Sequence, residues 1–205
     1  MNSYKTLHRI TGCILAVFIA AHLTNHLLAW WGIENHQLWL ERFRKVYRQP
    51  VAEIILVLCF AVQVYSGIKL FWQQRRNNAL STAQRLQMYA GLALGLFIIQ
   101  HIPAAIGLRW YHGFDTNFYF AANVVVQAPL KYYFIPYYFL GVAAAGIHLA
   151  ATHYVKMKAL HKGNQGFWQA IIITIVFVAA AVIILYLLTG GHYPFTIPEV
   201  YKNSF

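Results

Sequence analysis

The chain has 205 residues, of which 60% are hydrophobic and only 10% are charged. A soluble domain carries about 25% charged residues, so this composition excludes an ordinary soluble fold and indicates a surface that faces lipid. The formal net charge of +11 would suit a nucleic-acid-binding protein, but the basic residues flank long apolar runs, so membrane lipids with anionic headgroups are the expected partners and nucleic acid is not.

Five apolar segments are long enough to cross a bilayer, which requires about 20 mostly apolar residues. In chain order they run from Leu7 to Trp31, Val51 to Trp72, Leu86 to Leu108, Tyr133 to Tyr154 and Phe167 to Leu188. No soluble segment separates them. The sequence therefore predicts one all-α domain over residues 1–205, an integral membrane bundle of five transmembrane helices.

Two of the connections are long enough to have structure of their own. The link from Gly32 to Gln49 mixes apolar, aromatic and charged residues, which favours a short amphipathic helix on the membrane surface. The link from Arg109 to Lys131 is long enough to form a cap over one face of the bundle.

The distribution of charge favours a cytoplasmic N-terminus, as expected for a protein of a bacterial inner membrane. With that orientation nine of the 16 basic residues fall on the inner side, whereas all five acidic residues fall on the outer side. The excess of Lys and Arg on the cytoplasmic side is small, and the acidic residues contribute little to this rule. The nine inner residues are Lys5, Arg9, Lys69, Arg75, Arg76, Arg85, Lys156, Lys158 and Lys162.

Histidines inside the predicted spans are the main candidates for a functional site. Five of the ten histidines lie within the apolar segments or near their ends, namely His22, His26, His101, His148 and His153. An ionisable side chain at membrane depth is by default a functional-site hypothesis.

His22 and His101 are expected at the same depth. Each lies about 15 residues after the inner start of its span, which is about 22 Å at the rise of an α-helix. The first and third spans run in the same direction, so both imidazoles fall in the outer half of the bilayer. Level imidazoles on neighbouring helices could hold a haem iron between them. Interhelical hydrogen bonding without a cofactor is the alternative.

His148 is expected in the inner half of the bilayer, where the second span places Gln63 at the same level. A glutamine amide is a poor iron ligand compared with an imidazole. The two side chains are therefore expected to share a hydrogen bond between helices or to line a site for a quinone carbonyl.

Two stretches of the first span resemble a known family. Leu7-His8-Arg9-Ile10-Thr11-Gly12 and His22-Leu23-Thr24-Asn25-His26 are similar to the first helix of the cytochrome b membrane anchor of succinate dehydrogenase and fumarate reductase. The single-subunit form of that anchor has five helices and about this length.

The resemblance implies specific haem ligands. It places one b-type haem between the first and third helices, on His22 and His101. Di-haem members hold a second haem between the second and fourth helices, where His148 matches one ligand and Gln63 stands in place of the other. This departure favours one haem b and leaves a second haem open.

The resemblance also implies a function. The chain would relay electrons between a quinone, as substrate, and partner flavoprotein and iron–sulfur subunits. It has no Gly-rich dinucleotide motif and no cysteine cluster, so it would not be catalytic alone. A haem-free membrane anchor or assembly subunit is the alternative, and a transporter is disfavoured because no inverted repeat is visible. The sequence leaves open whether the chain forms a homo-oligomer.

Overall fold

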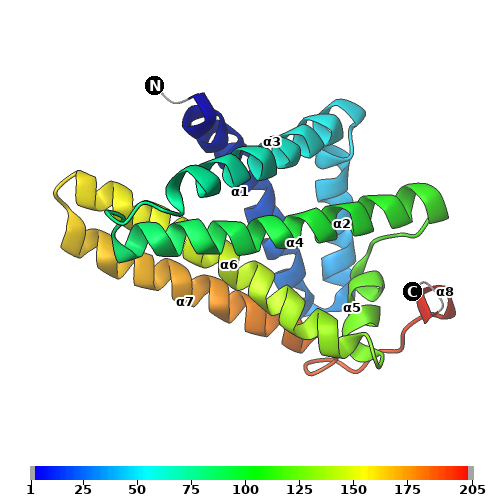
Figure 1. Cartoon of the computed structure of the whole chain (residues 1–205). Coiled ribbons are helices and arrows are strands. Elements are labelled where there is room, and N and C mark those ends of the chain that lie inside the picture. Colours follow the sequence, from blue (N-terminus) through cyan, green and yellow to red (C-terminus); the bar gives the residue numbers. More distant parts are fainter. Residues whose placement is uncertain (1–2, 203–205) are drawn as a thin grey trace.

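The computed structural model describes residues 3–202, which form helices and no strands (Figure 1). The elements are α1 (Ser3–Leu27), a 3₁₀ turn η1 (Leu28–Trp31), α2 (Ile33–Tyr47), α3 (Pro50–Gln74), α4 (Thr82–His112), α5 (Phe118–Val126), α6 (Lys131–Ala159), α7 (Gly163–Leu188) and α8 (Glu199–Lys202).

The five predicted spans are confirmed as helices long and apolar enough to cross a membrane. They comprise Ser3–Trp31, Pro50–Gln74, Thr82–His112, Lys131–Ala159 and Gly163–Leu188. The helices extend past the predicted spans at nearly every end, because a helix can continue through polar residues beyond the hydrocarbon layer, whose thickness limits only the apolar stretch. The structure therefore confirms the predicted all-α bundle of five transmembrane helices.

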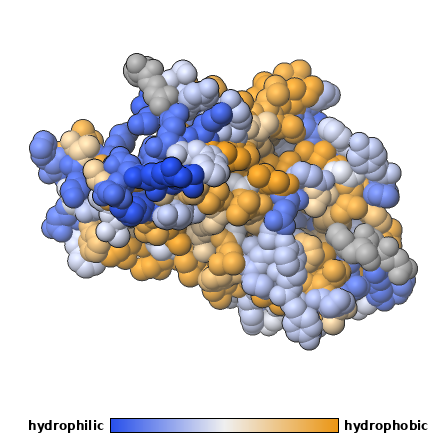
Figure 2. Space-filling model, in the orientation of Figure 1, coloured by the Kyte–Doolittle hydropathy of each residue, from blue (hydrophilic) through white to orange (hydrophobic). Residues whose placement is uncertain are grey.

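The surface of the bundle has the polarity of an integral membrane protein. Large apolar side chains stand outward along the spans, including Val17, Ile54 and Ile172. Figure 2 shows apolar surface across the middle of the molecule and hydrophilic surface gathered toward its ends. Lipid tails can cover such a belt at little cost, whereas water cannot, so the chain contacts membrane lipid.

We call the end that holds Ser3 and the links 75–81 and 160–162 the inner end, and the opposite end the outer end, after the predicted orientation. At the inner end, Ser81 caps α4 in a reciprocal arrangement with Gln84. At the outer end, α4 stops at Gly113, whose φ of +67° is a conformation that favours glycine. These local signals fix where α4 begins and ends.

The spans pack as two groups of helices. In the first group α6 packs closely on both α7 and α4, and in the second α1 packs on α3. Small residues allow the close approach within the first group, since Gly141 lies against Phe97 and Gly146 lies against Phe177. The two groups meet where α3 contacts α4 and where α1 contacts α7, whereas α1 comes near α4 and α6 at only a few points. Side chains therefore fill the space between α1 and the helices α4 and α6.

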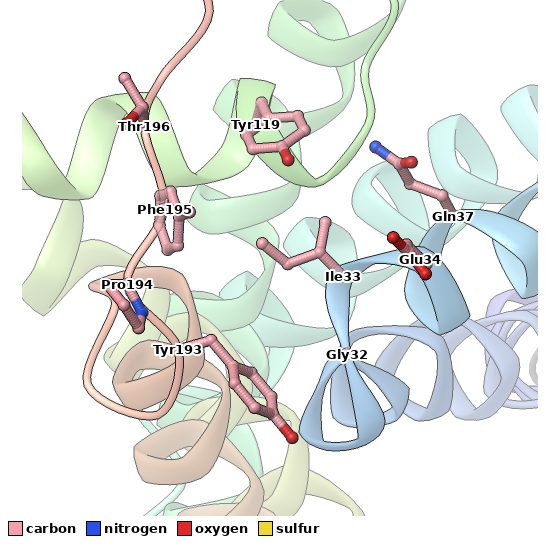
Figure 3. Close-up of a pocket in the computed structure, with 9 residues that line it drawn as sticks. All are labelled: Gly32, Ile33, Glu34, Gln37, Tyr119, Tyr193, Pro194, Phe195 and Thr196. Atoms are coloured by element: carbon pink, nitrogen blue, oxygen red, sulfur yellow. The ribbon is translucent and has the colours of Figure 1, made fainter.

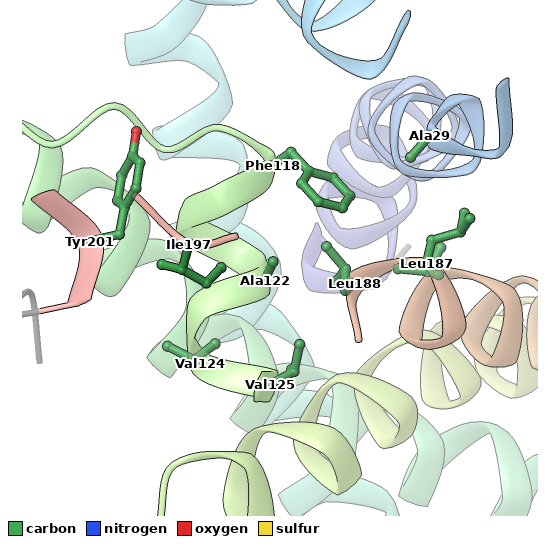
Figure 4. Close-up of a cluster of buried hydrophobic side chains, with 10 residues drawn as sticks. Ala29, Phe118, Ala122, Val124, Val125, Leu187, Leu188, Ile197 and Tyr201 are labelled. Atoms are coloured by element: carbon green, nitrogen blue, oxygen red, sulfur yellow. The ribbon is translucent and has the colours of Figure 1, made fainter. Parts of the chain in front are cut away.

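The outer end has its own hydrophobic core (Figure 4). Five of the nine residues of helix α5 are buried there, and the helix packs against α6, the end of α7 and the C-terminal segment. The Asn123 side chain donates a hydrogen bond of 2.7 Å to the backbone carbonyl of Tyr201, which ties α8 to α5. The link predicted as a cap thus contains a helix that forms part of the core of the outer end.

The predicted amphipathic helix in the link Gly32–Gln49 is α2, which runs across the direction of α4 and α6 (Figure 1). Its buried side chains are His36, Leu40 and Arg44, spaced four residues apart on one side of the helix. Arg44 is held by Glu41 at 2.7 Å and by Asp115 at 2.6 Å. The buried face of α2 is therefore partly polar.

Candidate functional site

His22 of α1 and His101 of α4 face each other across the two helix groups. Their ring centroids lie 6.2 Å apart and their ring planes are inclined at 69°. The predicted meeting of these two side chains is thus observed. Among residues 3–202, neither imidazole has a hydrogen-bond partner.

Aromatic rings surround this outer pair. Phe18 stacks on His22 with centroids 5.9 Å apart, and Phe97 stacks on His101 at 4.8 Å. A small cavity of about 10 Å³ reaches His22 from the side of α2. That volume holds about one water molecule. The outer pair therefore lies in a nearly dry, apolar setting.

A line of imidazoles continues from the outer pair toward the outer end. The ring of His26 lies 4.8 Å from that of His22, and the ring of His36 lies 5.3 Å from that of His26. Asn25 contacts His36 with its amide nitrogen 3.1 Å from Nε2. The Oδ1 of Asn25 and the Nδ1 atoms of His26 and His36 are buried without a partner.

His36 is the member of this line that lies outside the spans. Only 1% of its surface is exposed. Burial, together with the nearby His22 and the positive charge of Arg44, lowers the pKa of His36 to about 4. The imidazole is therefore neutral at physiological pH.

A second pair lies nearer the inner end, between His8 of α1 and His148 of α6. Their ring centroids are 6.3 Å apart and the planes are inclined at 79°. This separation is nearly the same as that of the outer pair. The sequence analysis placed His148 in the inner half of the bilayer but did not predict His8 as its partner.

The predicted hydrogen bond between Gln63 and His148 is wrong. The amide nitrogen of Gln63 lies 3.2 Å from Nε2 of His8, and its Oε1 accepts a bond of 2.6 Å from Thr11. The Nδ1 of His148 instead lies 2.8 Å from the backbone carbonyl of Gln87. Gln63 therefore joins α3 to α1, because these two helices pack on each other.

Helix periodicity was the signal that could have found His8. Its position is 14 residues before His22, which is close to four full turns, so the two side chains share one face of α1. Thr11, Leu15 and Asn25 are buried on that same face. The buried stripe of α1 thus links the two histidine pairs.

Two further histidines contact neighbouring side chains. His153 of α6 pairs with Gln169 of α7 at 2.7 Å, which is an ordinary contact between neighbouring helices. His192 stacks on Trp30 with centroids 4.3 Å apart. Neither belongs to the two pairs.

A broad surface hollow of about 540 Å³ lies at the outer end (Figure 3). It is formed by the start of α2, Tyr119 and the segment 193–196. Glu34 is the one acidic or basic side chain in its lining, and no histidine reaches it. The hollow is therefore separate from the histidine pairs.

Charges are distributed unequally between the two ends. The ion pairs among the described residues join Arg44 to Glu41 and Asp115, Arg109 to Glu53, and Lys202 to Glu199, all toward the outer end. The basic residues of the inner end have no acidic partner in the described part of the chain. The inner end therefore presents an uncompensated positive surface.

No family model, curated protein or solved structure matches this chain. The two histidine pairs are therefore the main guide to its function.

Proposed function

We propose that the chain is a membrane-embedded b-type cytochrome that relays electrons between a quinone and a partner redox subunit. The observation that carries this proposal is the distance between the ring centroids of His22 and His101, which belong to different helix groups. An iron about 2 Å from one nitrogen of each imidazole sets the ring centroids about 6 Å apart. The observed 6.2 Å fits that arrangement.

The chemistry of the surrounding residues supports haem at this position. Among the described residues neither imidazole has a competing hydrogen bond, and no group of three or more His, Cys, Asp or Glu side chains that could hold a metal ion is found. When bound, haem supplies one-electron redox chemistry. The protein would contribute the two axial nitrogens, and the aromatic shell of Phe18 and Phe97 would exclude water.

Haem insertion at this pair would require the helix groups to separate. The cavity that reaches His22 has room for about one water molecule, and Phe18 and Phe97 occupy the space beside the rings. Such a separation would break the contacts of α3 with α4 and of α1 with α7, which join the two groups. The two phenylalanines would also have to rotate away from the imidazoles.

The inner end is the surface proposed to meet the partner. Its basic residues lack acidic partners among residues 3–202, so they would attract an acidic flavoprotein or iron–sulfur subunit. The same excess of positive charge favours a cytoplasmic location for this end and for the N-terminus, in a bacterial inner membrane.

A haem-free membrane anchor is the second candidate. The close packing of Phe18 on His22 and of Phe97 on His101 favours it, because stacked aromatic rings already fill the space between the helices. The histidines would then serve only as packing groups.

The test is a reduced-minus-oxidised spectrum of the purified full chain, together with its haem content. His22→Ala and His101→Ala should each remove one haem, and the double variant should lose no more than either single variant, because both ligate one iron. His153→Ala is the matched control and should retain all haem. A colourless wild-type protein that is folded would establish the haem-free alternative.

A further inference from the structure

We propose that α2 is a latch that holds the two helix groups together at the outer end and opens to admit haem to the outer histidine pair. The identity of the ligand that passes the latch rests on the proposed function. The latch itself depends on the polar contacts of α2, so its opening can be measured on the chain without any cofactor.

Helix α2 contacts both helix groups. It follows α1 and precedes α3 in the chain and packs on both, and it also contacts α5, which packs on α6 and α7. Its side chains Leu40, Phe43 and Tyr47 line the small cavity that reaches His22. The ring of Tyr47 also lies 5.5 Å from that of Phe18, which stacks on His22. Helix α2 therefore covers His22 and bridges the two groups.

The polar side chains of α2 bind the segment that follows α4. Arg44 forms an ion pair of 2.6 Å with Asp115, and Arg48 donates a hydrogen bond of 2.9 Å to Oγ1 of Thr116. Both acceptors lie in the link between α4 and α5, which belongs to the first group. These two contacts thus join the second group to the first through α2.

A further ion pair crosses the same boundary, between Arg109 of α4 and Glu53 of α3. The other two ion pairs among the described residues each join side chains three positions apart in one helix. Every ion pair that joins different elements in residues 3–202 therefore bridges the two groups at the outer end. The inner end has no such bridge in the described part of the chain.

The closed position of α2 leaves several polar atoms without a partner in the protein. Six buried side-chain N or O atoms among residues 3–202 have no hydrogen-bond partner, and five of them lie on α2, at its C-terminal cap or on the part of α1 that faces it. The five are Asn25 Oδ1, His26 Nδ1, His36 Nδ1, Arg44 Nε and Arg48 Nε. Such atoms gain hydrogen bonds to water when they are exposed. This gain offsets part of the loss of the bridges when α2 opens.

The two ends of α2 allow it to move as a unit. Gly32, at its start, has a φ of +116°, a conformation that favours glycine, and glycine can also adopt many others. At its other end, Arg48 and Gln49 separate α2 from Pro50, the first residue of α3. Both changes of chain direction thus lie outside the helix, so α2 can swing without unwinding.

Release of the latch would act on the outer pair in two ways. Movement of Leu40, Phe43 and Tyr47 would open the cavity beside His22 to the outer surface. Loss of the bridges would also let the two groups part between His22 and His101. Return of α2 would then close the site again.

The first experiment measures hydrogen–deuterium exchange of the cofactor-free full chain in detergent. Asp115→Asn removes the charge that binds Arg44 and keeps the side-chain size, so exchange of the α2 amides (33–47) should rise by about tenfold. Glu199→Gln makes the same chemical change in an ion pair within α8 and should leave α2 at the wild-type rate. Exchange in α7 reports in the same samples that both variants are folded.

The second experiment follows the absorbance of haem as it binds to the same three proteins. Asp115→Asn should take up haem about tenfold faster than wild type, since uptake follows the fraction of open protein, whereas Glu199→Gln should match wild type.

The outcomes separate the latch from the proposed function. Faster α2 exchange in Asp115→Asn, in a chain that binds no haem, supports the latch and overturns the cytochrome. Haem binding with unchanged α2 exchange in Asp115→Asn overturns the latch and leaves the cytochrome. Faster exchange with equal rates of haem uptake overturns the role of α2 in haem entry.

Discussion

The two histidine pairs reach the same ring separation in opposite surroundings. The outer pair is packed between phenylalanine rings and makes no hydrogen bond, whereas the inner pair is held by Ser66, Gln63 and the carbonyl of Gln87. Two different kinds of surroundings thus accompany nearly the same ring separation in one bundle. The difference lies in what each arrangement does to the ring: hydrogen bonds select a tautomer, and stacking does not.

The largest effect predicted for the outer region is a dependence of stability on pH through His36. The folded-state pKa of about 4 lies below the unfolded value of about 6.5. Between these values the unfolded chain binds a proton that the folded chain does not, so stability should fall as pH is lowered from about 6.5 to about 4. A full shift of this size corresponds to about 3 kcal/mol.

Thermal unfolding of wild type and His36→Gln in detergent, from pH 7.5 to pH 4, would measure this effect. The variant should show a shallower loss of stability across that window, because glutamine does not titrate. Equal slopes would mean that His36 does not contribute and that the line of imidazoles at the outer end is no more sensitive to acid than the rest of the chain.

A substitution of intermediate effect concerns the inner region. Gly91→Ala places a Cβ within 2.8 Å of the His148 ring, which must then move away from the Gln87 carbonyl. Overpacking of this kind costs about 1–3 kcal/mol. Gly107→Ala, in the same helix, is the matched control, because no atom lies within 4 Å of the added Cβ.

Unfolding temperature should separate the two glycine variants. Gly91→Ala should unfold at a lower temperature than wild type, and Gly107→Ala should match wild type. Equal unfolding temperatures in the two variants would contradict the close packing of His148 on Gly91.

The smallest predicted effect is that of Ser66→Ala, which removes the acceptor for Nδ1 of His8. The loss of one buried hydrogen bond costs about 1 kcal/mol. Ser66→Ala should therefore lower the unfolding temperature by less than Gly91→Ala does. Thermal unfolding of both variants in detergent would test this, and a larger loss of stability in Ser66→Ala would contradict it.

The sequence by itself determined the membrane class, the five spans and the level of His22 with His101. Each of these follows from a property of a single helix: the length of its apolar stretch, its rise per residue or the direction in which it crosses the membrane. The position of α2 was also predictable from its mixed composition. No information about neighbouring helices was needed for any of them.

Only the tertiary structure decided which side chains meet across helices. The pairing of His8 with His148, the attachment of Gln63 to His8, and the burial of His36 and Arg44 depend on how each helix is rotated and which helices are neighbours. Hydrophobicity cannot set these rotations in a span that is apolar on all sides. They are set by the packing of small residues such as Gly141 and Gly146 and by buried polar contacts.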